Sequence, residues 1–590
     1  MPDTDDYTYV NQVLDWLKGQ GWHDNVQHRL NPPQGTPIHF SRIAQLPMAG
    51  LVSLLEFCGF GPKGAATIMA LIYPAFLFAG FCAAMRWLAR CFVPNRWSGA
   101  SAYIALFATA TLFMFQPGHI DHHGLNILLI TLSLGCAARM IRDPARSVWG
   151  FGAGAFLALS LTIALEVLPW LLLISGWVGL AALARGPLAA RQGLAFGVAL
   201  HFGSLVGLLL TRAPHALGTL DALSYSMTYV LLTGGIAFTL VVIALAWTVK
   251  FPRSVVWLIG VVVPVSFGTL FLHRFPELLV GPYGGMDPAL SQIILGVINE
   301  AQPLKSSQAT WLDVSRNSSG ALIALVALGV FLWRDKDAQA RWRWALLALI
   351  LVGAMGLSIF YQKRYMAAMG MASIVPLLAL LQRGWGRLSA WRVDDSRQAR
   401  TKVLCELGLL LLVGPLPSVI YPAVLDGRKF NTDMLLFPAM KGSYSDRCGM
   451  HRLENVLRDP LLLGGEPKLI MNTLGDGPEL LFRTQHKVLS APYHMNVEGN
   501  IDATRFFSTP YPEEARDIAM RRGVDIVVLC RYFPEMYMRV SMAKGPAVEG
   551  NNKDFAAHFI MLLVTGKHPD WLKPVIVPGL NNFVIYKVVK

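Results

Sequence analysis

The feature that most constrains this chain is a series of apolar stretches, each about 20 residues long, that runs through its first 422 residues. A helix of that length crosses the roughly 30 Å of hydrocarbon in a bilayer. The composition agrees, since 54% of the 590 residues are hydrophobic and the mean hydropathy is +0.45. Only 15% of the residues are charged, whereas soluble proteins carry about 25%. The sequence therefore predicts a polytopic α-helical membrane protein. Twelve stretches qualify: 65–85, 99–116, 124–140, 149–165, 168–184, 192–211, 227–249, 254–272, 319–333, 343–360, 365–382 and 403–422.

Basic residues occur in every second loop between these stretches. They are Arg86, Arg90 and Arg96; Arg139, Arg142 and Arg146; Arg185 and Arg191; Lys250 and Arg253; Arg334, Lys336, Arg341 and Arg343; and Arg383, Arg387, Arg392, Arg397, Arg400 and Lys402. The positive-inside rule places these loops in the cytoplasm. The alternate loops then lie outside: 1–64, 117–123, the region around 166, 212–226, 273–318, 361–364 and everything after 423. The net charge of +14 thus reflects membrane topology, and we expect no nucleic-acid partner.

The first 64 residues lie outside by this count, although the chain starts with polar residues and has no apolar leader. We expect either that the true initiation site lies upstream, or that another device delivers this segment across the membrane. We favour the first alternative. It adds one helix and gives thirteen.

After residue 423 the composition becomes that of a soluble module. We predict an extracytoplasmic α/β domain over 423–590, following a first outer segment (1–64) and a transmembrane domain (65–422) with a large outer loop (273–318). The chain has no Gly-x-Gly-x-x-Gly fingerprint after a strand, so nucleotide binding is not expected. The elements predicted in the outer domain are four strand-length runs at 468–474, 486–490, 524–530 and 582–589, and an amphipathic helix at 512–522.

Seven cysteines occur in the chain, and five of them lie in or beside the apolar stretches, where cysteine commonly acts as an apolar filler. The other two, Cys448 and Cys530, belong to the outer domain. An oxidising compartment permits a disulfide there, and we predict one between them.

Asp121, His122 and His123 lie together at the outer start of an apolar stretch. Ionisable residues at such a position are costly to insert and commonly mark a functional site. A carboxylate with imidazoles suits a divalent cation such as Mn²⁺ or Mg²⁺. The structural alternative is a helix N-cap by Asp121 with histidines at the headgroup level.

Asp5 and Asp6 lie in the first outer segment, on the same side of the membrane as Asp121. Separated carboxylates and a histidine can complete a cation site whose remaining positions bind a diphosphate. The alternative interpretation of two acidic residues near a terminus is a solvated charge run.

Two further outer segments carry candidate residues. The loop 273–318 is long enough to act as a lid or binding loop, and in it Glu300 is a lone carboxylate among apolar residues. Lys305 of the same loop can reach a phosphate or snorkel to the membrane surface. Lys363 and Arg364 are cations on the side that the positive-inside rule disfavours, where an arginine can clamp a phosphate or anchor to headgroups.

Together these segments resemble the membrane glycosyltransferases of the GT-C fold, and most closely the catalytic subunits of oligosaccharyltransferase. The resemblance covers roughly residues 1–385. Four motifs occur in the order of that family: Asp5-Asp6-Tyr7, Asp121-His122-His123, Glu300-Ala301-Gln302-Pro303 and Gln362-Lys363-Arg364-Tyr365.

The resemblance implies a role for each motif. Asp5, with Asp6 as the reserve, joins Asp121 and His123 in holding the cation. Glu300 bridges metal and acceptor, so that Asp5 and Glu300 are the catalytic candidates. Arg364, beside Lys363, contacts the phosphate of the lipid carrier.

The chain departs from the family in the outer domain, which lacks the Trp-Trp-Asp motif that grips the acceptor sequon. Asp476 is a candidate for the equivalent place. The segments 24–42 and 492–496 are similar to uncharacterised bacterial relatives of the fold. The first contains His28 and Arg29 and the second His494. Acceptor or substrate contacts are therefore expected among Asp6, His39, Arg42, His122, Asp476 and His494.

The function expected from this reading is transfer of a sugar or oligosaccharide from a polyprenyl phosphate or diphosphate to an external glycan, lipid or protein. The reaction would occur at the periplasmic face of a bacterial inner membrane. Asp221 and Glu166 are either substrate contacts or structural residues. The alternatives are a transferase that moves a single sugar onto lipid A or a polysaccharide, a metal-independent polymerase or ligase, and a transporter of lipid-linked sugars. No internal repeat supports transport.

Overall fold

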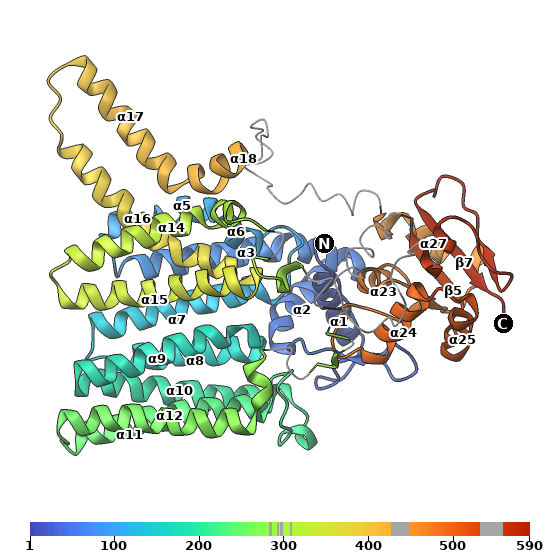
Figure 1. Cartoon of the computed structure of the whole chain (residues 1–590), viewed down its shortest axis with the longest axis horizontal. Coiled ribbons are helices and arrows are strands. Elements are labelled where there is room, and N and C mark those ends of the chain that lie inside the picture. Colours follow the sequence, from blue (N-terminus) through green and yellow to red (C-terminus); the bar gives the residue numbers. More distant parts are fainter. Residues whose placement is uncertain are drawn as a thin grey trace.

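Apolar helices form an elongated bundle, and a mixed α/β domain lies beyond one of its ends (Figure 1). The computed structural model describes residues 1–281, 286–288, 290–291, 294, 299–306, 309–425, 448–531 and 558–590. Parts of the large outer loop singled out in the sequence, 282–285 and 295–298, lie outside these residues. The prediction of a polytopic α-helical membrane protein with a carboxyl-terminal α/β domain is confirmed.

Nine helical segments among the described residues are long and apolar enough to cross a membrane, and a bent pair adds a tenth. The bent pair joins α17 (Ser396–Val413) to the segment Leu416–Leu425, which contains α18 (Tyr421–Leu425), at an angle of 58°. The nine are α3 (Pro62–Ala89), α7 (His122–Arg142), Leu165–Arg185 containing α9 (Leu168–Arg185), α10 (Pro187–Thr211), α11 (Met227–Thr248), α12 (Arg253–Arg274), α14 (Trp311–Arg334), α15 (Ala338–Phe360) and Lys363–Ala390 containing α16 (Met366–Ala390).

Two of the predicted stretches differ from single long spans. The stretch at 149–165 forms α8 (Val148–Ile163), which has only 16 residues. The stretch at 99–116 breaks into α5 (Ser101–Phe107) and α6 (Thr109–Phe113), because the ψ of Ala108 is 70°, outside the helical range. The Thr111 hydroxyl of α6 then donates to the carbonyl of Ala367 in α16, at 2.7 Å. Hydropathy does not detect this break, because it sums over the whole stretch and carries no information on the backbone angle at Ala108.

Small residues bring α8 and α10 together. A Cβ added to Gly154 would lie 2.2 Å from the carbonyl oxygen of Phe196, and one added to Gly150 would lie 2.2 Å from that of Gln192. Membrane helices approach this closely only where small residues line the contact. Gly150 and Gly154 therefore set the spacing of this helix pair.

Replacing Gly154 with alanine should separate α8 from α10 and lower the free energy of unfolding by about 1–3 kcal/mol, a typical overpacking cost. Gly179→Ala in α9 is the matched control, because a Cβ there meets no atom within 4 Å. Both changes raise helix propensity equally. Thermal unfolding in detergent measures the difference, and equal midpoints would contradict this account of the packing.

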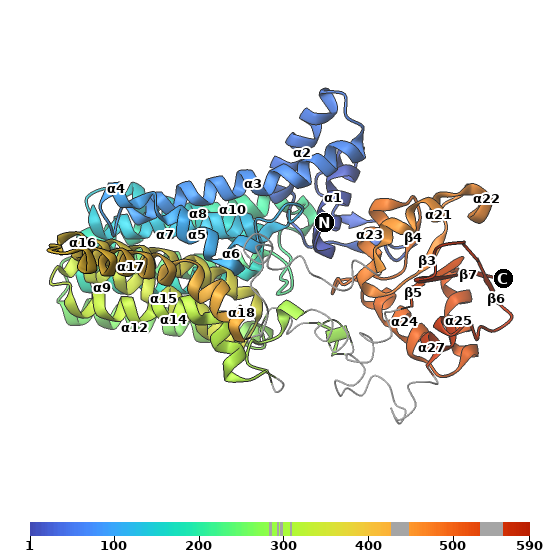
Figure 2. The same cartoon turned by 90° about the horizontal axis from the view of Figure 1, so that it is seen from above.

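The first outer segment lies between the bundle and the outer domain (Figures 1 and 2). It contains α1 (Thr4–Leu17), a short ribbon of β1 (Val26–Gln27) and β2 (Thr36–Pro37), and α2 (Arg42–Phe57). Asp3 and Asp6 form a capping box at the start of α1. The other end of this segment depends on Arg42, whose buried guanidinium donates to the carbonyls of Gln12 and Asp24 at 2.9 and 2.7 Å.

The outer domain has a five-stranded sheet in the order β4-β3-β5-β7-β6. Its parallel half is β4 (Lys487–Val488), β3 (Leu469–Met471) and β5 (Ile526–Cys530), and its antiparallel half adds β7 (Phe583–Val588) and β6 (Leu572–Pro574). Each of the four predicted runs contains one strand, whereas the short β6 gave no sequence signal. The helices of the domain include α23 (Gly477–Arg483), α24 (Val497–Ser508), α25 (Pro512–Arg522) and α27 (Phe559–Val564).

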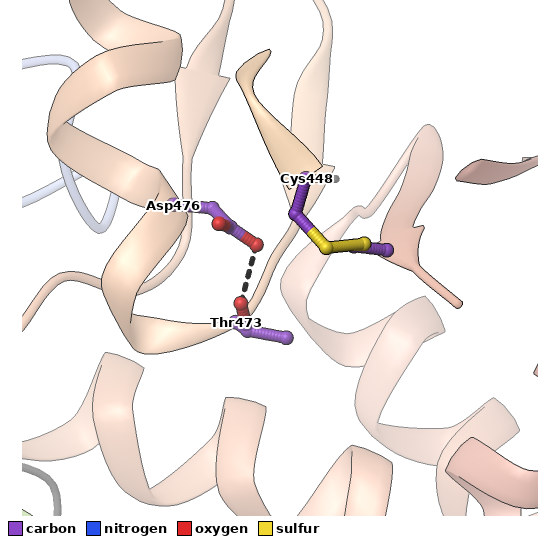
Figure 3. The surroundings of a disulfide bond; sticks show 4 residues. Cys448, Thr473 and Asp476 are labelled. Atoms are coloured by element: carbon purple, nitrogen blue, oxygen red, sulfur yellow. Dashed lines mark hydrogen bonds between the residues drawn. A yellow bond between two sulfur atoms is a disulfide. The ribbon is translucent and has the colours of Figure 1, made fainter. Parts of the chain in front are cut away.

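Cys448 and Cys530 form a disulfide, the pairing that the sequence predicts. Their Cα atoms lie 5.7 Å apart, and the bond joins positions 82 residues apart in the chain. Figure 3 shows the bond next to Thr473 and Asp476, in the turn that follows β3. The disulfide therefore ties the start of the described outer domain to the end of its central strand.

Candidate functional site

Asp121 begins membrane helix α7. Its carboxylate caps the helix by accepting a hydrogen bond from the backbone N–H of His123 at 2.9 Å. The same carboxylate lies 3.7 Å from Nδ1 of His119 and 3.6 Å from Nε2 of His123. The N-cap interpretation and the cluster interpretation of this motif are thus compatible, because one oxygen caps the helix and the other faces two imidazoles.

Asp6 attaches α1 to this turn. Its Oδ1 accepts hydrogen bonds from the backbone N–H groups of Ile120 and Asp121, at 2.7 and 3.1 Å, and lies 3.2 Å from Nδ1 of His119. Its Oδ2 accepts from the backbone N–H of Asp3. Asp6 is fully buried, and protein donors surround it.

Two carboxylates favour the protonated form of His119. Burial alone would lower its pKa, but the carboxylates of Asp121 and Asp6 outweigh burial and raise the pKa of His119 to about 9. The charged imidazole therefore compensates part of the negative charge that Asp6 and Asp121 bring to the turn.

Glu166 fixes the ring of His123. Its carboxylate oxygens lie 2.8 and 2.9 Å from Nδ1 of His123, and it also accepts a hydrogen bond from Nδ2 of Asn126 at 3.1 Å. Asn126 in turn accepts from the Ser160 hydroxyl at 2.8 Å. A carboxylate on Nδ1 holds the proton there and leaves the Nε2 lone pair for a metal, the usual arrangement of metal-ligating histidines. Nε2 faces Asp121 and Glu300, whose nearest oxygens lie 3.6 and 3.9 Å away.

Glu300 and Arg364 form an ion pair, with Nη2 3.0 Å from Oε1. The backbone around them is paired, because the N–H of Lys363 donates to the carbonyl of Gln302 at 2.8 Å. The N–H groups of Leu304 and Lys305 donate to the end of α15. These bonds attach the described part of the large outer loop to the start of the Lys363–Ala390 segment, which places Glu300 opposite His123.

Asp5 is held from the outer domain. Its Oδ1 accepts a hydrogen bond from the Tyr493 hydroxyl at 3.1 Å. Removal from water, with the charges of Asp3, Asp121 and Glu300, raises the pKa of the Asp5 carboxyl well above its usual range. The negative charges gathered here therefore favour a bound cation.

Among the described residues, two groups have ligand atoms within 4.8 Å of one another: Asp6, His119 and Asp121, and His122, His123 and Glu166. Asp6 and Glu166 use their oxygens for protein hydrogen bonds. The predicted set Asp5, Asp121 and His123 is not one of these two groups. Nε2 of His123 lies near the carboxylates of Asp121 and Glu300, at 3.6 and 3.9 Å, and the charges of Asp121, Glu300 and His123 act on Asp5. Oxygen ligands with one imidazole fit a divalent cation.

A small pocket of about 30 Å³ lies beside these groups. Its polar wall contains His123, Asn126, Glu166 and Arg364, and its remaining lining is mostly apolar and includes Trp170. The pocket thus places apolar side chains next to the charged cluster.

Of the remaining candidates, some lie around this cluster and three do not. His122 packs its ring 4.4 Å from that of His123 and 5.8 Å from that of Phe40. The rings of His39 and His494, from the first outer segment and the outer domain, are 4.7 Å apart. The other three are engaged elsewhere: Arg42 in its buried network, Asp476 with the Thr473 hydroxyl (Figure 3), and Asp221 with Arg212 at 4.0 Å.

Three residues of the cluster were not given their roles by the sequence. The sequence leaves Glu166 open as a substrate contact or a structural residue, gives His119 no role, and contains Tyr493 only within the segment 492–496. Glu166 carried a signal, a lone carboxylate at an outer helix end. Tyr493 carried none, because its partner Asp5 is 488 positions away.

Comparison with known proteins identifies the fold. Neither a protein-family model nor a curated protein matches the sequence. Solved structures do match. The archaeal oligosaccharyltransferase AglB from Archaeoglobus fulgidus, in complex with an inhibitory peptide and a dolichol-phosphate, has a TM-score of 0.65 at 12% identity, covering 97% of this chain and 75% of that one.

Two further structures of an oligosaccharyltransferase from the same archaeon agree. The apo form has a TM-score of 0.62 at 14% identity, covering 93% of this chain and 68% of that one. The complex with Zn and sulfate has a TM-score of 0.61 at 13% identity, covering 92% and 66%. The chain therefore has the GT-C fold of the oligosaccharyltransferases, which confirms the resemblance at the level of the fold.

Glu166→Gln should weaken cation binding by about 10–100-fold, because a neutral amide no longer holds the proton on Nδ1 of His123. Titration of Mn²⁺ into the purified protein, followed by the electron paramagnetic resonance of free Mn²⁺, measures the affinity. Glu513→Gln, at a side chain that is 77% exposed on α25, is the control and should bind as the wild type does. Equal affinities of all three proteins would contradict the role given to Glu166.

Proposed function

We propose that this protein is a membrane glycosyltransferase that transfers a sugar or oligosaccharide from a polyprenyl phosphate or diphosphate to an acceptor outside the cytoplasm. The observation that carries the proposal is the continuous contact from Asp121 through His123 and Glu300 to Arg364, each step within 4 Å, beside a small and mostly apolar pocket. A lipid-linked sugar requires acidic ligands for a metal ion, a positively charged side chain such as Arg364 for its phosphate, and apolar side chains for its lipid.

The cation site would consist of Asp5, Asp121 and His123, with Mn²⁺ or Mg²⁺ as the ion. When bound, the ion neutralises charge on the departing phosphate. The chain's own contribution is to orient these ligands: Glu166 holds the ring of His123, and Asp6 holds the turn that carries Asp121. The Zn and sulfate complex of the A. fulgidus enzyme supports a metal site in this fold.

The donor would bind with its phosphate at Arg364, beside the small pocket, and its prenyl chain along the apolar surface of the bundle. A guanidinium offers two parallel N–H groups to phosphate oxygens, and Lys363 adds a second positive charge. AglB in complex with a dolichol-phosphate supports a lipid phosphate as the ligand of this fold. Because the lipid phosphate is the leaving group, no nucleotide is needed.

The acceptor would approach Glu300, which orients or deprotonates it. His39 and His494 lie between the first outer segment and the outer domain, and Asp476 lies deeper in that domain. A solved structure of the A. fulgidus enzyme carries a tethered acceptor peptide. The outer domain of this chain has Trp571 as its single tryptophan after residue 423, so it cannot contain the Trp-Trp-Asp motif that grips a peptide sequon. The absence of that motif favours a glycan or lipid acceptor, as in a transferase that modifies lipid A or a polysaccharide.

The arginine distribution supports the orientation proposed here. The cluster lies at the end of the bundle opposite the basic loops, which corresponds to the periplasmic side of a bacterial inner membrane. The first outer segment (1–64) and the outer domain (423–590) would then enclose the site above the transmembrane domain (65–422).

Asp121→Asn should abolish transfer and leave the fold intact, because asparagine caps a helix as well as aspartate does. The native host carrying this variant should accumulate one lipid-linked sugar, identified by mass spectrometry of the polyprenyl lipids. The control is Asp337→Asn, which changes the N-cap of α15 at the opposite end of the bundle and should leave the lipid pool unchanged.

The outcomes separate the alternatives. A lipid pool identical to that of the wild type would contradict the proposal and return attention to transport. Accumulation together with loss of one glycoconjugate would identify the acceptor class. Activity that survives a chelator would favour a metal-independent polymerase or ligase.

A further inference from the structure

One side chain of the outer domain reaches the cation ligands directly. Tyr493 is 3% exposed, and its hydroxyl lies 3.1 Å from Oδ1 of Asp5 and 2.5 Å from Oγ1 of Thr8, both in α1. Its ring packs edge-on against Phe40, with centroids 5.8 Å apart. The contact therefore links two segments of the chain that are separated by the whole transmembrane domain.

The polarity of these hydrogen bonds follows from their chemistry. In the ionised form that binds a cation, the Asp5 carboxylate only accepts, so the Tyr493 hydroxyl then donates to Asp5 and accepts from the Thr8 hydroxyl. The carbonyl of Thr4, 3.4 Å away, is a second and longer acceptor. Within the described residues, Oδ2 of Asp5 makes no hydrogen bond. The bond to Oδ1 thus fixes the rotation of the carboxylate and leaves its other oxygen for a ligand.

The loop that carries Tyr493 is held by buried amides. Asn500 donates to the carbonyl of Tyr493 at 3.0 Å and accepts from the N–H of Ala491 at 3.1 Å. Asn496 donates to the carbonyl of Leu489 at 3.1 Å and to Asn500. These four hydrogen bonds hold the backbone on both sides of Tyr493, so the hydroxyl is presented to Asp5 from a defined support.

We propose that the outer domain completes the cation site, with Tyr493 as the positioning residue for Asp5. The inference rests on the proposed function, because Asp5 matters here as a cation ligand. Hydrogen-bond partners of metal ligands set ligand orientation and commonly change metal affinity by about 10–100-fold. The outer domain then contributes to the reacting centre as well as to acceptor binding, and the site is incomplete without it.

Tyr493→Phe tests the inference, because it removes the hydroxyl and keeps the ring against Phe40. In the full-length protein in detergent, the Mn²⁺ dissociation constant should rise by about tenfold or more. Tyr586→Phe is the matched control: this hydroxyl is also buried in the outer domain but donates to the carbonyl of Leu563 at 2.7 Å. It should bind Mn²⁺ as the wild type does.

A kinetic readout separates positioning from general damage. Excess Mn²⁺ should restore most of the transfer activity of Tyr493→Phe, since the chemistry is unchanged once the ion is bound. If that variant fails to fold, Thr8→Val removes the partner hydroxyl from α1 instead and should also raise the Mn²⁺ dissociation constant.

The result also distinguishes this inference from the proposed function. Wild-type affinity in Tyr493→Phe, alongside weakened binding in Asp121→Asn, would overturn the role of Tyr493 and leave the proposed cation site standing. Absence of Mn²⁺ binding in the wild type would overturn both.

Discussion

The hydrogen bonds of the buried Asp6 carboxylate are the interactions on which the rest of the site depends. The carboxylate accepts hydrogen bonds from the N–H groups of Ile120 and Asp121 and contacts His119, so that α1 is joined to the start of membrane helix α7. A buried carboxylate is tolerated only when donors surround it. By supplying those donors, the turn before α7 fixes where the first outer segment lies, and with it the position of Asp5, the residue before Asp6.

Charge balance explains why the cluster has this composition. Five carboxyl groups, those of Asp5, Asp6, Asp121, Glu166 and Glu300, come from distant parts of the chain to this cluster, which also contains the imidazole of His119 and the guanidinium of Arg364. An excess of negative charge at the edge of a membrane is unfavourable without a counter-ion. A divalent cation would restore the balance. A lipid phosphate bound at Arg364 would replace the Glu300 carboxylate as the partner of the guanidinium.

The outer domain is the part of the chain that departs most from the oligosaccharyltransferases, because it lacks their Trp-Trp-Asp motif. Its sheet and disulfide form a support for the loop 489–496, which faces the first outer segment, and α23 packs against α1. Under the proposed function, acceptor contacts would change along this surface while the contact with Asp5 keeps the domain attached to the first outer segment.

The sequence by itself determined the membrane helices, the side on which the acidic and histidine residues lie, and the cap of α7 by Asp121. These follow from hydropathy, loop charge and residues adjacent in the chain, which act locally. Only the tertiary structure decided the break at Ala108, the burial of Arg42, the attachment of His123 to Glu166 and the contact between Tyr493 and Asp5. Each depends on a hydrogen bond or packing contact between segments far apart in the chain. Such contacts exist only once the helices and the outer domain have packed, and no local pattern encodes them.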